Sequence, residues 1–207
     1  MENQNKELFD KTCALFNMID EKLCVMEKVG ANGKLSNVLK YELLAFLCYL
    51  SACDGRISRS EAQLIRDCYG LEMYPTNIND FLVENRIHSE EFLKKVPECL
   101  KIAVSVDNKM IDQGIDLSIG IGEIVIELFK VLGKAMVVAD EKVKAVEQVV
   151  WGTYITTLMQ YLVDNSKIHS IKPSMMPRPG TPIEVNYEMS LDKLGRVYTL
   201  FVGSLNG

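Results

Sequence analysis

The chain has few of the residues that most often carry out chemistry. It contains two histidines, His88 and His169, and its six cysteines form no CxxC pair. A zinc site or a redox disulfide would normally show such pairs, so we expect the cysteines to be small buried hydrophobic residues in a reducing cytosol. They are Cys13, Cys24, Cys48, Cys53, Cys68 and Cys99. No nucleophile–base pair can be read from the sequence, so we expect no enzyme, with no catalytic and no cofactor-binding residue.

Surplus positive charge and long uncharged apolar runs are also lacking. The formal net charge is -5, whereas a protein that binds nucleic acid needs a basic surface, so we expect no nucleic-acid partner. The most apolar stretch, 117–139, is interrupted by Glu123, Glu127, Lys130 and Lys134 and predicts a buried helix rather than a membrane span. The first residues, MENQNKELFDK, show no apolar signal segment, which favours a cytoplasmic location.

Hydrophobic residues recur with a helical period over residues 6–163. The fold class predicted is therefore all-α, a helical bundle of about six to eight helices. We expect the first helix from Lys6 through the apolar stripe that runs from Leu8 to Met26, ending at the glycines of GANG. Further helices are expected near 36–53, 59–69, 78–84, 116–138 and 141–163. One more is expected near 89–107, which Pro97 either kinks or starts anew.

The composition changes after Asn165. Four of the six prolines lie in the last 42 residues, and the segments 183–189 and 196–203 alternate or are rich in β-branched and aromatic residues. We therefore expect a helical domain over 1–165 and an extension over 166–207, made of a proline-rich linker and a β-hairpin. The extension has five basic and three acidic residues, opposite in sign to the rest. It could pack on the body, pair with a second copy or bind another protein.

The stretch CDGRISRSE resembles the second half of a calcium loop, with Asp54, Gly55 and Glu61 at positions 5, 6 and 12. Such a loop also needs oxygen ligands at positions 1 and 3, where this chain has Leu50 and Ala52. A self-contained calcium loop is therefore excluded.

The same stretch fits a helix start. Ser58 and Glu61 have the spacing of a capping box, in which each side chain bonds the other residue's backbone N–H. Gly55 can take the left-handed conformation that a turn requires, and Asp54 can accept from turn amides. Capping alone would account for every residue of the motif.

A weak repeat gives the motif a second interpretation. Residues 50–65 and 136–151 align with an offset of 86 residues, so that Asp54 matches Asp140 and Glu61 matches Glu147. If the two helical corners meet, these four carboxylates could bind a divalent cation, Mg²⁺, Mn²⁺ or Ca²⁺. Lys144 stands where the first corner has its serine, so the second corner has no capping box. A glutamate in a helix's first turn is also favoured by the helix dipole alone, and both readings stay open.

Two other motifs indicate structure rather than a ligand site. GIGIGE, within 117–139, lacks the spacing of a phosphate loop, and close helix packing explains its small residues better. The three aspartates of 107–116 are expected on a solvated loop.

ACDGRISRSE resembles the signature of TerB-like domains of the tellurite-resistance family. Asp54, Gly55, Ile57 and Glu61 occupy the pattern, and Asp140 and Glu147 are similar to the corresponding corner in the family's second half. The resemblance covers about 36–163 and does not include the proline-rich extension. It implies a compact all-α fold in a cytoplasmic bacterial protein of chemical-stress or phage resistance, which acts through protein partners or self-association, with a divalent ion, and not as an enzyme. The alternative is a structural scaffold or assembly subunit without ligand that docks through its C-terminal hairpin.

Overall fold

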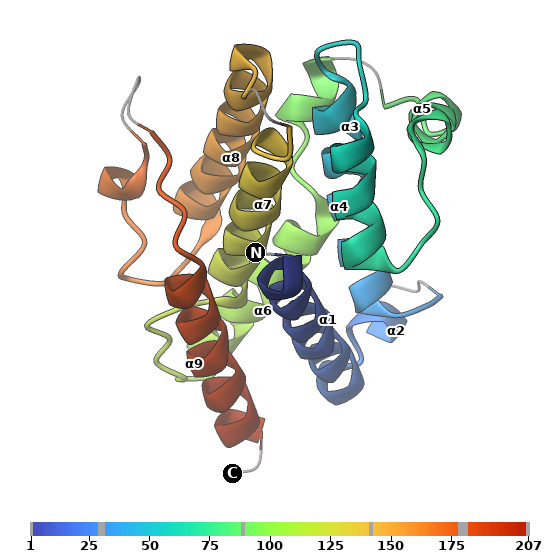
Figure 1. Cartoon of the computed structure of the whole chain (residues 1–207). Helices are drawn as coiled ribbons and strands as arrows, with labels where there is room; N and C mark the ends of the chain where they lie inside the picture. Colours follow the sequence, from blue (N-terminus) through green and yellow to red (C-terminus); the bar gives the residue numbers. More distant parts are fainter. Residues whose placement is uncertain (1, 29–31, 88–89, 141–142, 178–181, 206–207) are drawn as a thin grey trace.

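Every regular element in the described part of the chain is helical. In this computed structural model, the described residues are 2–28, 32–87, 90–140, 143–177 and 182–205. They form nine α-helices, against the six to eight predicted, and two 3₁₀ segments (Figure 1). The helices are α1 (Glu2–Leu23), α2 (Val25–Lys28), α3 (Leu35–Ala52), α4 (Arg59–Tyr69), α5 (Pro75–Glu84), α6 (Glu98–Asp112), α7 (Ile121–Val137), α8 (Ala145–Asn165) and α9 (Tyr187–Leu205). The 3₁₀ segments are η1 (Glu90–Lys94) and η2 (Pro173–Met175). The all-α prediction is confirmed.

Helix α7 is the centre of the bundle. It packs against α1, α3, α4, α6, α8 and α9, which explains why its sequence is apolar on nearly all sides. Among the described residues, no helix is both long and apolar enough to cross a bilayer. Gly133 lets α8 approach α7 closely, because a Cβ at that position would lie 2.5 Å from Trp151 Cδ1. Next to it, the Phe46 and Tyr154 rings stack with centroids 4.6 Å apart.

The predicted first helix is in fact two helices. It is interrupted at Cys24, which has a φ of 50°, and α2 continues after it. The Asp20 carboxylate holds the break, accepting from the backbone N–H of Met26 at 2.9 Å and of Leu35 at 3.1 Å. Cys24 is exposed and Cys53 is half-buried, so the prediction of buried cysteines holds for the other four.

Pro97 starts a new helix. The segment before it forms η1, and α6 begins at Glu98, directly after the proline. The Glu42 carboxylate of α3 accepts from the backbone N–H groups of Glu98 at 2.7 Å and of Cys99 at 2.8 Å. A carboxylate from another helix thus satisfies the first free amides of α6.

The predicted C-terminal β-hairpin is wrong. No strand occurs among the described residues, and the end of the chain forms α9, which packs against α1 and α7 (Figure 1). Leu194, Val197 and Phe201 are buried, at the three- and four-residue spacing of a helix face. Lys193 Nζ lies 3.0 Å from Glu127 Oε1 of α7. The sequence left three possibilities for the extension, and α9 realises the first of them, packing on the helical body.

Candidate functional site

The two acidic corners are the turns between α3 and α4 and between α7 and α8. In the first, Gly55 takes a φ of 85° and Asp54 Oδ1 accepts from the backbone N–H of Arg56 at 2.8 Å. Ser58 and Glu61 form the predicted capping box: Glu61 N–H donates to Ser58 Oγ at 3.1 Å, and Ser58 N–H donates to Glu61 Oε2 at 2.6 Å. The local account of this corner is confirmed.

The two corners meet at the ammonium of Lys144. Its Nζ lies 2.7 Å from Asp54 Oδ2, 3.2 Å from Asp140 Oδ2 and 3.1 Å from Glu147 Oε1. Because one nitrogen contacts carboxylates from both turns, the structure brings Asp54, Asp140 and Glu147 together. Glu61, the fourth predicted residue, makes no ion pair with Lys144 among the described residues. The contacts of Lys144 with Asp54 first, and then with Glu147 and Asp140, raise the lysine pKa, so the ammonium stays charged.

Glu61 is fully buried, at 0% exposure, on the side of the first corner. Its Oε2 is held in the capping box, and its Oε1 has no hydrogen-bond partner in the part of the chain that the structure describes. Burial raises the pKa of Glu61 to about 7, opposed by the bonds to Ser58 and supported by the charges of Asp140 and Glu147. The charges of the second corner therefore act on Glu61 in the same direction as its burial.

Glu147 is the corresponding residue of the second corner and is 1% exposed. Lys144, at the N-cap of α8, makes no side-chain cap, as its sequence predicted. Both Glu147 oxygens are buried without a hydrogen-bond partner among the described residues, and Oε1 has only its ion-pair contact with Lys144. Burial raises the pKa of Glu147 even though Lys144 acts in the opposite direction.

The cluster of Asp54, Glu61, Asp140, Glu147 and Lys144, called the acidic cluster below, combines four carboxylates with one ammonium. When all are ionised, negative charge is in excess, and three buried oxygens, one of Glu61 and two of Glu147, accept no hydrogen bond among the described residues. Such a deficit of positive charge and of donors is costly in a buried place.

The donor set fits a hard divalent cation, since all its groups are carboxylate oxygens. The arrangement of these carboxylates does not fit a metal ion. Within the described ranges, no three carboxylate, imidazole or thiol groups surround one point in the way a metal requires. Lys144 Nζ lies at the point where the carboxylates converge. A divalent ion would therefore bind only if this side chain moved outward, which its 28% exposure allows.

Cys53 borders the acidic cluster but is poorly suited to act as a nucleophile. Burial raises its thiol pKa to about 12, and the charges of Glu147, Asp54 and Glu61 act in the same direction. A thiol in this environment stays protonated, whereas reactive cysteines have a lowered pKa.

In the sequence, Lys144 stands out only as a departure from the first corner. Its spacing from two acidic residues could have predicted the ion pairs. Lys144 is four residues after Asp140 and three before Glu147, which are the separations at which oppositely charged side chains meet on a helix surface. Its contact with Asp54 could not be read locally, because it depends on how the two corners pack.

Another buried carboxylate lies at the start of α7. Asp107, expected on a solvated loop, is instead on α6 and 1% exposed, so that expectation is wrong. Its two oxygens accept from the backbone N–H groups of Ile121 at 2.8 Å and of Gly122 at 2.9 Å. A Cβ at Gly120 would lie 2.4 Å from Asp107 Oδ2. The small residues of GIGIGE thus serve close packing, and a protein carboxylate fills the place that a phosphate would need.

Comparison with known proteins adds no relative: no protein-family model, no curated protein and no solved structure matches the chain.

Proposed function

We propose that this protein is a TerB-like interaction module of bacterial stress response or phage defence, without enzymatic activity, whose two acidic corners bind a divalent cation. The observation that carries the proposal is the meeting of Asp54, Asp140 and Glu147 around one position, although they come from turns 86 residues apart. Lys144 occupies that position as an internal cation, and Mg²⁺, Mn²⁺ or Ca²⁺ would replace it.

The unpartnered oxygens of Glu61 and Glu147 support the exchange. Each is buried, and each belongs to a carboxyl group whose pKa is raised by burial. One ammonium carries one charge and three donors, so it leaves these oxygens unsatisfied. A divalent ion carries two charges and takes six to eight oxygen ligands, or six for Mg²⁺, which would use them.

Exchange of the ammonium for an ion would connect the site to the surface of the protein. Lys144 is the N-cap of α8, and its neighbours Val143 and Val146 are exposed. Movement of the Lys144 side chain would alter the charge and shape presented at this end of α8. We propose that this is how ion binding changes the protein's affinity for a partner.

The experiment is thermal unfolding in EDTA and in millimolar Mg²⁺, Mn²⁺ or Ca²⁺. At an ion concentration about 100 times Kd, binding contributes about 2.7 kcal/mol, or roughly 5–10 °C in Tm for a chain of this length. Glu147→Gln should abolish the shift. Glu123→Gln is the matched control, because Glu123 is also a buried glutamate in the first turn of its helix but lies outside the acidic cluster.

A second function, a scaffold subunit with no ligand, is favoured by the same ammonium. If Lys144 is permanent, the acidic cluster is an ion-pair lock that fixes the two corners to one another. The hairpin through which such a scaffold was expected to dock is not formed, so it would use another surface. The scaffold is the better description if no ion shifts the Tm of the wild-type protein and Glu147→Gln responds in the same way as Glu123→Gln.

A further inference from the structure

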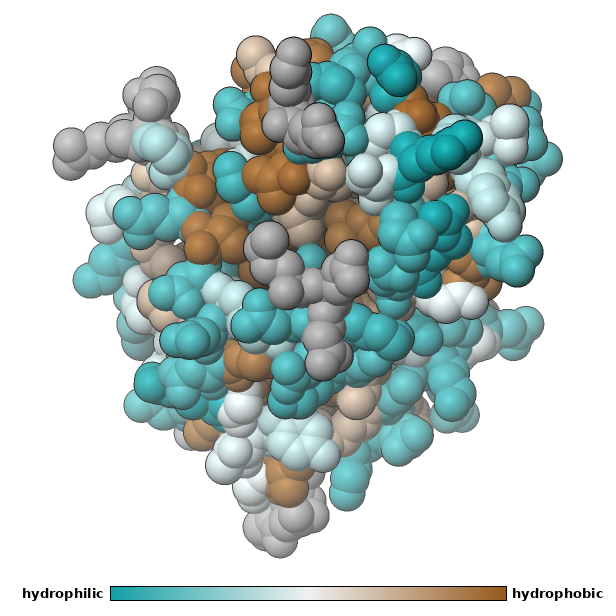
Figure 2. All heavy atoms as spheres, in the orientation of Figure 1, coloured by the Kyte–Doolittle hydropathy of each residue, from teal (hydrophilic) through white to brown (hydrophobic). Residues whose placement is uncertain are grey.

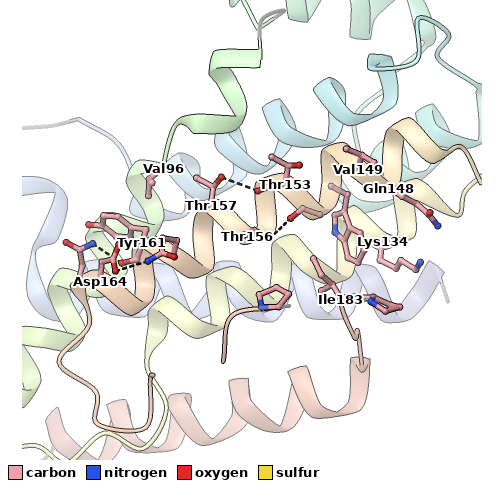
Figure 3. Close-up of a pocket in the computed structure, with 16 residues that line it drawn as sticks. Val96, Lys134, Gln148, Val149, Thr153, Thr156, Thr157, Tyr161, Asp164 and Ile183 are labelled. Atoms are coloured by element: carbon pink, nitrogen blue, oxygen red, sulfur yellow. Dashed lines mark hydrogen bonds between the residues drawn. The ribbon is translucent and has the colours of Figure 1, made fainter. Parts of the chain in front are cut away.

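The outer face of α8 is a ridge between two grooves. Val149, Thr153 and Thr157 line both grooves, and their four-residue spacing places them in one row along the helix. One groove, of about 1070 Å³, runs between α8 and the chain around Ile183 (Figure 3). The other, of about 730 Å³, separates α8 from α5 and η1. A ridge flanked by grooves is a shape that can pack against a copy of itself.

The outer face of α8 is unusually poor in charged residues for a protein of net charge -5. From Gln148 to Val163 the helix has no charged residue, and Val149 is 66% exposed. Thr156 and Thr157 donate their hydroxyl hydrogens to carbonyls of α8 itself, at 2.8 and 3.1 Å, so these hydroxyls need no outside acceptor. Figure 2 shows hydrophobic residues gathered over the upper part of the bundle, around α7 and α8, on the side that it displays.

The two ends of the larger groove carry opposite charges. Lys134 lies at one end, with its Nζ 5.4 Å from the centroid of the Trp151 ring, and has no carboxylate partner among the described residues. Asp164 lies at the other end and accepts from Gln160 at 2.8 Å. Figure 3 shows Lys134 and Asp164 at opposite ends of the groove, with the uncharged row of α8 between them.

We propose that a second copy of this chain docks on the outer face of α8, with the two α8 helices antiparallel about a two-fold axis near Thr153–Thr157. A two-fold rotation exchanges the ends of the groove, so Lys134 of each copy faces Asp164 of the other. The same rotation brings the exposed Val149 toward Val96, which lies at the Asp164 end (Figure 3). The net charge of both copies is negative and opposes association, and this repulsion is weakest where the uncharged faces meet.

This inference does not rest on ion binding, because none of these residues belongs to the acidic cluster. It is tested by sedimentation equilibrium of the full chain in EDTA and again in Mg²⁺. The wild-type protein should be a dimer. Lys134→Glu and Asp164→Lys should each weaken the dimer about tenfold, since each places two like-charge pairs in a symmetric interface. The double variant should recover wild-type affinity to within about threefold, because the pairs form again with reversed sign.

Lys109→Glu is the matched control. Lys109, like Lys134, is a lysine in the last turn of its helix, and it is exposed on α6. It should leave the dimer unchanged. Thr153→Arg should abolish the dimer and, because Thr153 is exposed, should leave the urea midpoint unchanged at a protein concentration so low that the wild type is also monomeric. A monomeric wild-type protein, a double variant no better than the single ones, or a dimer that tolerates Thr153→Arg would each overturn the proposal.

Discussion

The two acidic corners hold a buried glutamate in the first turn of a helix in different ways. Ser58 and Lys144 occupy equivalent N-cap positions, and each is followed three residues later by a buried glutamate, Glu61 or Glu147. The first corner satisfies its glutamate with a local capping box. The second has no box and uses a long cationic side chain, which also reaches Asp54 of the first corner. The comparison teaches that one corner is capped by its own residues, whereas the other has a cationic side chain in place of a cap.

The largest effect is expected at Lys144. Lys144→Met keeps the length of the side chain and removes its charge, which leaves three carboxylates without a counterion. Breaking a buried ion pair costs about 3–5 kcal/mol, and the partial exposure of Lys144 places the expected loss near the lower limit, about 3 kcal/mol in EDTA at pH 7. Urea unfolding measures it. A loss below about 1 kcal/mol would show that the second corner does not depend on a cation.

The next effect concerns the pH dependence of stability. Burial raises the pKa of Glu61 to about 7 from its usual 4.5, so the folded protein holds this proton more tightly than the unfolded chain does. The resulting stability is fully present below about pH 4.5 and is lost as the pH rises through 7. Glu61→Gln cannot ionise and keeps the residue type that a capping box allows. Its unfolding free energy should change by about 2 kcal/mol less than the wild type's between pH 5 and 8.

The control for this pH profile is Glu98→Gln, which changes an exposed glutamate in the first turn of α6. Urea unfolding is measured in EDTA at several pH values for all three proteins. If the Glu61→Gln profile runs parallel to that of the wild type, Glu61 does not carry the raised pKa and the account of the first corner is wrong.

A smaller loss is expected from the capping box itself. Ser58→Ala removes the acceptor of the Glu61 N–H bond and should cost about 1 kcal/mol, seen as a lower urea midpoint at unchanged slope. Ser60→Ala, at an exposed position two residues later, is the control and should change little. Equal midpoints for the two variants would mean that the box contributes nothing to stability.

The smallest effect is expected from a substitution that gives the second corner the N-cap serine of the first. Lys144→Ser would place a serine three residues before Glu147 and create at the second corner the box that the first one has. The backbone is suitable, because Lys144 has φ and ψ of -92° and 134° and Ser58 has -84° and 164°. Lys144→Ser should be more stable than Lys144→Met by about 0.5–1 kcal/mol in urea unfolding. Equal stability would show that the two corners are not interchangeable.

The sequence predictions that were accurate rest on local patterns. The capping box of Ser58 and Glu61 and the turn at Gly55 depend on neighbouring residues, so spacing alone was enough. The convergence of Asp54 with Asp140 followed from the repeat, because two similar helical corners tend to pack in similar ways. The role of Lys144 required the position of a residue 90 places earlier in the chain and could not be read from one stretch.

The error at the C-terminal end of the chain arose where two periods competed. Ile183, Val185 and Tyr187, in the segment 183–189, alternate as in a strand. The structure instead follows the longer period of Leu194, Val197 and Phe201, which bury one helix face against α1 and α7. Asp107 was misplaced for another reason. A buried carboxylate that holds the first turn of a distant helix has the same sequence appearance as one on a solvated loop.

The central claim, that the acidic corners form one cation site in which Lys144 stands in for a divalent ion, is tested most directly by calorimetric titration of Mn²⁺ into Lys144→Met and into the wild type. Removal of the competing ammonium should give Lys144→Met the higher affinity, by about tenfold or more, with one ion bound per chain. Glu147→Gln in the same background should remove the binding. If Lys144→Met binds no Mn²⁺, the four carboxylates do not form a cation site, and the claim is contradicted.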